Sequence, residues 1–84
     1  MVVLIALPNE LGQVRIGVIA SRVIGGAVKR NRAKRLIRSA IQGLLPKITV
    51  GVDIILLARR PIIKVKSANL EPVIETLLNE AKVI

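Results

Sequence analysis

The chain has 84 residues, 52% of them hydrophobic, and a formal net charge of +9, but no Cys, His, Phe, Trp or Tyr. Without Cys and His there is no disulfide framework, no thiolate metal site and no histidine to act as acid or base. The beginning MVVLIALPNE has no positive region before its apolar residues, and no apolar run is long enough to cross a bilayer, so we expect a soluble cytoplasmic protein. The apolar content predicts one folded domain over residues 1–84 rather than a disordered basic tail.

Two β-strands are predicted in the first quarter of the chain. Residues 2–7, VVLIAL, form an apolar run that the turn pair Pro8-Asn9 closes. The short connection NELGQ predicts that this strand pairs with the next one as an antiparallel hairpin. Gly25 and Gly26 then permit a tight turn. The second strand is indicated by alternation of Val14, Ile16, Val18 and Ala20 with Arg15, Gly17, Ile19 and Ser21.

Residues 27–45 predict an amphipathic helix, which Gly43 and Pro46 end. Because successive residues of a helix are rotated by about 100°, apolar and polar side chains separate onto different sides. The apolar face, which is expected to cover a sheet, holds Ala33, Leu36, Ile37, Ala40, Ile41 and Leu44. The adjoining and opposite arc holds Arg30, Asn31, Lys34, Arg35, Arg38 and Gln42.

The second half of the chain predicts one more strand and one more helix. Residues 52–58, VDIILLA, are typical of a strand buried on both faces, and the preceding helix makes it the end of a β-α-β unit with parallel strands. Residues 62–66 fit a loop or a short strand, and residues 67–82 a helix capped by Ser67 or Asn69. The fold class is therefore α+β, a small α/β sandwich in the order β-β-α-β-α.

Residues 11–47 carry as many positive charges as the whole net charge and no negative one. A solvated helix normally mixes the two signs, because opposite charges four residues apart stabilise it, whereas Arg30, Lys34 and Arg38 are like charges at that spacing. A membrane-surface helix usually adds Trp or Phe, and a nuclear localisation signal is usually a flexible segment. Arg forks and Lys ammonium groups fit phosphates best, so the pattern favours a polyanion as partner. The basic residues are Arg15, Arg22, Lys29, Arg30, Arg32, Lys34, Arg35, Arg38 and Lys47.

The stretch IGGAVKRNRAKRLIRSAIQGLLP, followed by VGVDIILLARRP, resembles the bacterial ribonuclease P protein component. That family is marked by an Arg-Asn-Arg motif in a helix after a glycine-containing turn, which Arg30-Asn31-Arg32 matches here. The resemblance implies a sandwich like that of a ribosomal-protein domain, with a left-handed β-α-β crossover. The general rule would predict a right-handed one.

The same resemblance implies a subunit that binds a catalytic RNA, which cleaves the 5′ leader from precursor tRNA with magnesium ions. The protein itself would hold no metal and no catalytic residue, and a cleft between the basic helix and the sheet would receive the leader. Ile5 stands where the family often has an aromatic residue, and the resemblance assigns the leader cleft to Ile5, Arg15, Ile19 and Ser21. The predicted RNA-binding residues are Arg22, Lys29, Arg30, Asn31, Arg32, Lys34, Arg35 and Arg38, and helical spacing places Arg32 nearest the apolar face.

The chain departs from the family pattern at two points. The family usually begins with an additional helix that bears aromatic residues, whereas this sequence starts at the first strand, and its reduced alphabet also fits a simplified or reconstructed sequence. Stacking of leader bases on aromatic rings, about 1–3 kcal/mol per base, cannot occur. Apolar surface uncovered by a missing helix could be buried by self-association.

Two other classes of function compete with this interpretation. One is a hydrolytic enzyme in its own right, but the five carboxylates are scattered and only Asp53 lies next to the parallel strand. The other is a general RNA- or DNA-binding module such as a ribosomal protein, which shares the same electrostatics.

Overall fold

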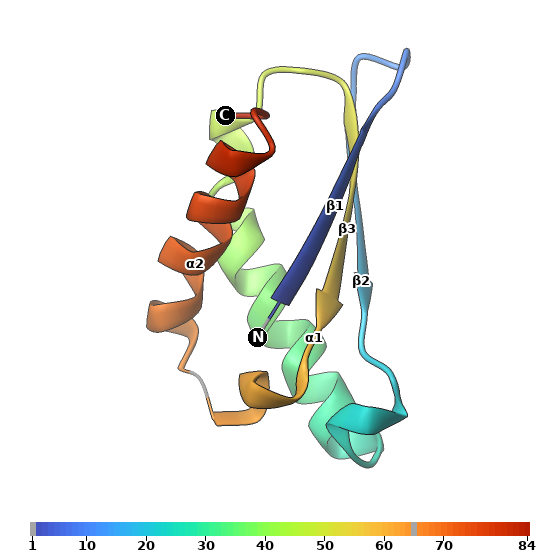
Figure 1. Cartoon of the computed structure of the whole chain (residues 1–84), viewed down its shortest axis with the longest axis vertical. Coiled ribbons are helices and arrows are strands. Elements are labelled where there is room, and N and C mark those ends of the chain that lie inside the picture. Colours follow the sequence, from blue (N-terminus) through green and yellow to red (C-terminus); the bar gives the residue numbers. More distant parts are fainter. Residues whose placement is uncertain (1, 65) are drawn as a thin grey trace.

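A computed structural model describes residues 2–64 and 66–84, in which two helices lie on one face of a three-stranded sheet (Figure 1). The strands are β1 (Val2–Pro8), β2 (Val14–Ile19) and β3 (Val52–Ala58). The helices are α1 (Ala27–Gln42) and α2 (Ser67–Glu80), and three short 3₁₀ helices are η1 (Arg22–Ile24), η2 (Leu45–Lys47) and η3 (Arg60–Lys64). The predicted α+β order is therefore confirmed.

The sheet has the order β1-β3-β2, so the predicted hairpin of the first two strands is wrong. β1 pairs with β3 in antiparallel fashion and β2 pairs with β3 in parallel, as the β-α-β unit predicts. The loop between the first two strands passes over the beginning of β3: the Asn9 N–H donates to the Gly51 carbonyl, and the Val52 N–H donates to the Gln13 carbonyl. β3 is the most buried of the three strands, and in the central position both of its edges are paired.

The crossover from β2 through α1 to β3 is left-handed. In Figure 1 β2 and β3 both point downward, β3 lies nearer the viewer, and α1 covers their left side. Seen from the helices with the strands pointing up, β3 therefore lies to the left of β2. This is the handedness that the resemblance implies and the rare one among parallel units.

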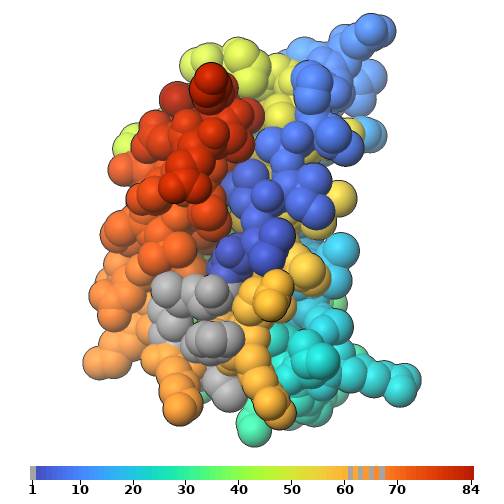
Figure 2. All heavy atoms as spheres, viewed as in Figure 1, coloured from blue at the N-terminus to red at the C-terminus, as the bar shows by residue number. Residues whose placement is uncertain are grey.

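The core lies between the helices and the inner face of the sheet. Alternate residues of β3, from Val52 to Ala58, are buried there, and the inner side chains of β1 and β2 pack beside them. Figure 2 shows that the side chains of α2 and β1 pack against each other along one side of this layer. Each fully buried aliphatic side chain contributes about 1.5–3 kcal/mol by its removal from water. The largest of them are Ile37, Leu44, Ile54, Leu56, Ile62, Leu70, Ile74 and Leu78.

The outer face of the sheet is only partly covered. Asp53, Ile55 and Leu57 of β3 are half-buried there, so the expectation of burial on both faces holds for the inner face alone. Their neighbours in the adjoining strands give partial shelter, but both helices lie on the other side (Figure 1).

The two helices end differently. α1 is followed by Gly43, which keeps a helical backbone with φ −68°. α2 ends in a Schellman motif, in which Lys82 has φ 62°, its N–H donates to the Asn79 carbonyl, and the Val83 N–H donates to the Leu78 carbonyl.

The predicted start of the last helix needs a correction. Lys66 occupies the N-cap position of α2 with an extended backbone, and Asn69 lies inside the first turn, so neither predicted cap residue is the N-cap. Residues 60–64 form η3 rather than a strand, because Pro61 removes a backbone donor and favours a turn. The remainder of the predicted segment 62–66 includes Val65, which lies outside the described residues. Within the described ranges, no helix is long and apolar enough to cross a membrane.

Candidate nucleic-acid interface

Helix α1 is held in one orientation by its apolar face. Ala33, Ile37, Ala40 and Ile41 are buried against the sheet and α2, and Leu36 packs at their edge, as predicted. Since these positions recur at helical spacing, they fix where every polar side chain of the helix points. The packing of the apolar face therefore fixes the direction in which the cations of α1 point.

One flank of α1 faces the edge strand β2. Arg38 lines a groove of about 260 Å³ together with Ile16 and Val18 of β2. Arg30 and Lys34 lie on the same flank, four residues apart, and both are half-buried. Half-burial is typical of a long cationic side chain whose aliphatic stem covers apolar surface while its charged end reaches solvent.

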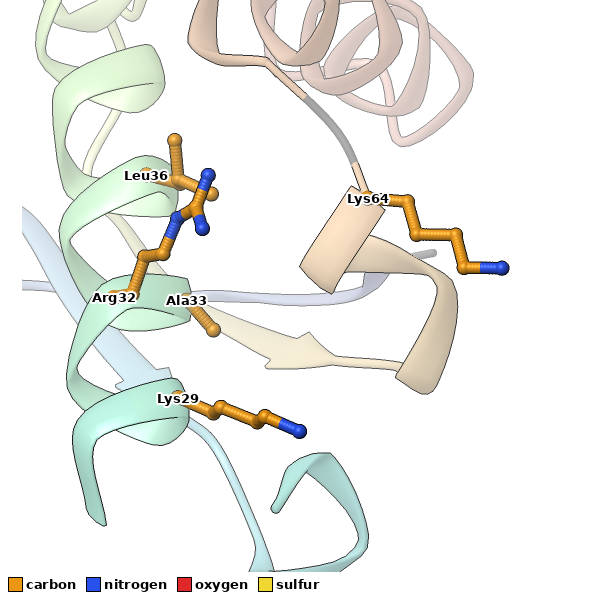
Figure 3. Close-up of a pocket in the computed structure, with 5 residues that line it drawn as sticks. All are labelled: Lys29, Arg32, Ala33, Leu36 and Lys64. Atoms are coloured by element: carbon orange, nitrogen blue, oxygen red, sulfur yellow. The ribbon is translucent and has the colours of Figure 1, made fainter. Parts of the chain in front are cut away.

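The other flank of α1 faces η3. Lys29 and Arg32 line a pocket there with Ala33, Leu36 and Lys64 (Figure 3). Arg32 thus lies at the boundary of the apolar face, as the helical spacing predicts. Asn31 and Arg35 are exposed on the side of α1 between the two flanks.

The cations of α1 have no acidic partner in the described part of the chain. Within residues 2–64 and 66–84 the ion pairs are Arg15 with Asp53 and Lys47 with Glu75, and neither involves α1. The positive field of this helix is therefore not cancelled by neighbouring groups. A ligand rich in phosphates would relieve the repulsion between its like charges.

Further cations lie at the end of the molecule where β2 and β3 end. They are not among the RNA-binding residues predicted from the sequence. Arg59 and Arg60 follow β3 directly, and Lys64 lies in η3. Arg22, a predicted RNA-binding residue, lies in η1, which packs against η3. The sequence could have predicted that these cations lie together, because they follow β2 and β3 and the carboxyl ends of parallel strands meet at one edge of a sheet.

The predicted leader-cleft residues occupy a different place from the one expected. Ile5, Arg15 and Ile19 all lie on the outer face of the sheet, which points away from both helices, so a cleft between α1 and the sheet is wrong for them. Successive side chains of a strand point to opposite faces of the sheet. Ile5, Arg15 and Ile19 alternate with the residues whose side chains point into the core, so they lie on the outer face. Ser21 is exposed in the link from β2 to η1.

The outer face is apolar except at one end. Ile5 and Ile19 are about half exposed, at 47% and 48%. At the polar end the Arg15 guanidinium donates two hydrogen bonds to Asp53, at 2.8 and 2.7 Å. These bonds, with one from the Asn9 amide, lower the pKa of the Asp53 carboxyl to about 2. The charge of Arg15 is thus matched by a carboxylate, unlike the charges of α1.

The carboxylates do not gather into a metal site. In the described part of the chain no three acidic side chains come together in a way that could hold a metal ion. Asp53, which lies beside the parallel pair, is occupied by Arg15 and Asn9.

The fold and the unpaired cations of α1 define a small basic α+β protein whose most highly charged surface is a helix. The family model described as Ribonuclease P matches residues 1–82. The chain belongs to the family of the bacterial ribonuclease P protein component.

Its relatives include that component of Dehalococcoides mccartyi, with 39% identity over 84 residues, which are 100% of this chain and 68% of the relative. The component of Chloroflexus aurantiacus is 39% identical over 80 residues, 94% of this chain and 59% of the relative. Among solved structures, the Staphylococcus aureus RNase P protein has 31% identity and a TM-score of 0.81, covering 98% of this chain and 75% of that one. The Thermotoga maritima RNase P protein has the same fold at 24% identity, with a TM-score of 0.83 over 94% of this chain and 76% of that one.

Proposed function

We propose that this protein is the RNA-binding subunit of a ribonuclease P, which binds the catalytic RNA through α1 and assists 5′ maturation of precursor tRNA. The observation that carries the proposal is the set of unpaired cations that a buried apolar face holds in a fixed direction, with the Arg30-Asn31-Arg32 motif among them. Magnesium ions belong to the RNA partner in this proposal, and the RNA performs the cleavage.

The proposed interface covers both flanks of α1 and extends to the adjoining end of the sheet. Arg30, Lys34 and Arg38 form a row on the β2 flank, and Lys29 and Arg32 lie on the η3 flank. Guanidinium groups offer phosphate oxygens two parallel hydrogen bonds, and Asn31 can donate to or accept from a ribose or a base edge. Arg22, Arg35, Arg59 and Arg60 would extend the same positive surface.

Reconstitution with a ribonuclease P RNA and a precursor tRNA at low magnesium tests the proposal. We expect the chain to restore cleavage and Arg30→Ala/Arg32→Ala to lose it, with RNA affinity reduced about tenfold or more, since a hydrogen bond to a charged group contributes about 1.5–3 kcal/mol. Lys47→Ala/Lys82→Ala is the control: it removes the same charge away from α1 and should keep both activities. Equal losses in the two double variants would contradict a role for α1.

Specificity separates this proposal from a general nucleic-acid-binding module. Ribonuclease P RNA should bind much more tightly than an unrelated RNA of equal length at the same salt concentration, and equal affinities would favour the general module. If about four to six phosphates are contacted, log affinity should fall against log salt with a slope of roughly −3 to −5. Cleavage of RNA by the protein alone would instead favour an enzyme.

The outer sheet face is the proposed contact for the leader of precursor tRNA. Its exposed side chains, Ile5 and Ile19, can offer aliphatic contact but no aromatic stacking. We therefore expect cleavage in the reconstituted enzyme to depend little on leader length, and a strong preference for a long leader would contradict this. The same apolar face is the proposed surface for self-association in the absence of RNA.

A further inference from the structure

The pocket between α1 and η3 has a chemistry that general phosphate binding does not use. Its volume is about 180 Å³, below the roughly 300–1,000 Å³ of drug-sized ligand sites. Lys29 and Arg32 come from α1 and Lys64 from η3, about thirty residues further along the chain. Ala33 and Leu36 form an apolar floor between them (Figure 3). A small cationic pocket with an apolar floor fits a ligand that is both anionic and partly apolar.

The positions of the side chains divide the pocket into two parts. Arg32 runs along α1 so that its guanidinium lies beside Leu36, whereas Lys29 extends from the preceding turn of the helix, below Ala33 (Figure 3). A guanidinium plane next to an aliphatic side chain is a surface on which a planar base can stack. Lys64 reaches outward from η3, and its flexible stem allows the ammonium group to turn towards an anion at the rim.

Among the described residues, no acidic side chain competes for these cations. None of the three forms an ion pair within residues 2–64 and 66–84. Glu71 of α2 lines a separate pocket with Ser39 and Ala40, one turn further along α1.

We propose that this pocket binds one nucleotide, with the base stacked on the surface that Arg32 forms with the floor of Ala33 and Leu36 and the phosphate between Lys29 and Lys64. Inorganic phosphate would gain nothing from the floor, and a base-paired nucleotide could not insert its base. The nucleotide is a free mononucleotide or an unpaired nucleotide of an RNA. The pocket belongs to the η3 flank of the proposed interface, but its test uses no ribonuclease P RNA, so the two proposals can fail separately.

Titration of the full chain with adenosine 5′-monophosphate, adenosine and inorganic phosphate at constant ionic strength, followed by backbone amide NMR shifts, tests the inference. Adenosine 5′-monophosphate should bind at least about fivefold more tightly than either of the other two, with shifts at Lys29, Arg32, Leu36 and Lys64. Equal binding of phosphate and the nucleotide, or shifts spread over the whole basic surface, would overturn it.

A charge-matched pair of variants separates the pocket from the general positive field. Lys64→Ala should weaken binding of adenosine 5′-monophosphate by about three- to tenfold, the range for loss of an exposed or partly desolvated charged contact. Lys82→Ala removes the same charge from a position just beyond the end of α2, outside the proposed interface, and should change it less than twofold. Both residues are exposed, so neither variant should unfold the protein. Equal weakening in the two variants would overturn the proposal.

Competition identifies the source of the nucleotide. A single-stranded pentanucleotide that displaces adenosine 5′-monophosphate from the wild type, and does so less well from Lys64→Ala, supports an unpaired RNA nucleotide in the pocket. Displacement by a duplex of the same length with equal strength would overturn the requirement for an unpaired base.

Discussion

The two helices of this protein pack against the sheet in the same way but carry opposite charges on their solvent sides. α1 and α2 lie side by side on one face of the sheet, and each buries an aliphatic stripe there. On its solvent side α1 carries only positive charges, and α2 carries only negative ones, at Glu71, Glu75 and Glu80. Glu75 is paired with Lys47, but the cations of α1 have no acidic partner among the described residues.

This contrast separates what the fold needs from what function needs. Because α2 packs as well as α1 without a cation, the positive side chains of α1 are not required by the core. Like charges four residues apart cost about 0.2–0.5 kcal/mol per pair in a helix. α1 keeps this repulsion between like charges. A negatively charged partner that binds α1 would explain why.

Core truncation should affect both helices alike. Ile37 of α1 and Ile74 of α2 are fully buried, so Ile37→Ala and Ile74→Ala should each lower the free energy of unfolding by about 2–5 kcal/mol. Urea unfolding followed by circular dichroism measures both. A large difference between them would break the idea that the two helices contribute equally to the core.

The way the chain enters α1 is specific to that helix. Gly25 has φ 136° and ψ −155°, a region essentially restricted to glycine, and a Cβ there would lie 2.7 Å from the Lys29 Cδ. Gly25→Ala should therefore destabilise the protein by about 1–3 kcal/mol. Gly26→Ser is the control, because Gly26 has an ordinary extended backbone with open space around it and serine is a good N-cap residue. Equal thermal midpoints for the two variants would show that the turn is not needed.

The end of α2 carries a strain that the end of α1 does not have. Lys82 adopts a left-handed backbone in the Schellman motif, whereas Gly43 after α1 has helical angles. Lys82→Gly should stabilise the protein by about 0.5–1 kcal/mol, and Lys82→Ala should not. A melting temperature unchanged or lower in the glycine variant would contradict this.

The smallest expected effect comes from Asp53, which lies in the sheet rather than on either helix. Its pKa is lowered from 3.8 to about 2 by its hydrogen bonds with Arg15 and Asn9, so its contribution to stability is complete above about pH 5 and is lost as the pH falls towards 2. Urea unfolding between pH 6 and pH 2 should show a small fall that Asp53→Asn lacks. The same fall in both proteins would contradict the assignment to Asp53.

The sequence predicts elements better than it predicts their neighbours in this protein. The apolar periodicity of α1 and the alternation in β2 locate both elements, because each pattern is local. The short loop from β1 to β2 suggests a hairpin, but the loop only sets the distance between the strands. Which strand fills the space between them depends on the packing of residues 52–58, far away in the sequence.

The candidate interface follows the same division. Arg30, Asn31 and Lys34 are identified from one continuous motif, and the buried face of α1 fixes their direction. Lys64 and Arg59 approach the same surface only because η3 folds back beside α1 and η1. The predicted leader residues were assigned to the wrong side of the sheet, since alternation shows that side chains share a face but not which face the helices cover.

The insertion of β3 between β1 and β2 has a consequence for the order in which the molecule can be made. β1, β2 and all of α1 emerge from the ribosome before any residue of β3 does. Neither of the first two strands has a neighbour to pair with until residues 52–58 emerge, so no part of this sheet can form early. For that interval the apolar residues of α1 have no sheet to pack against, although the cationic residues of the same segment have already emerged.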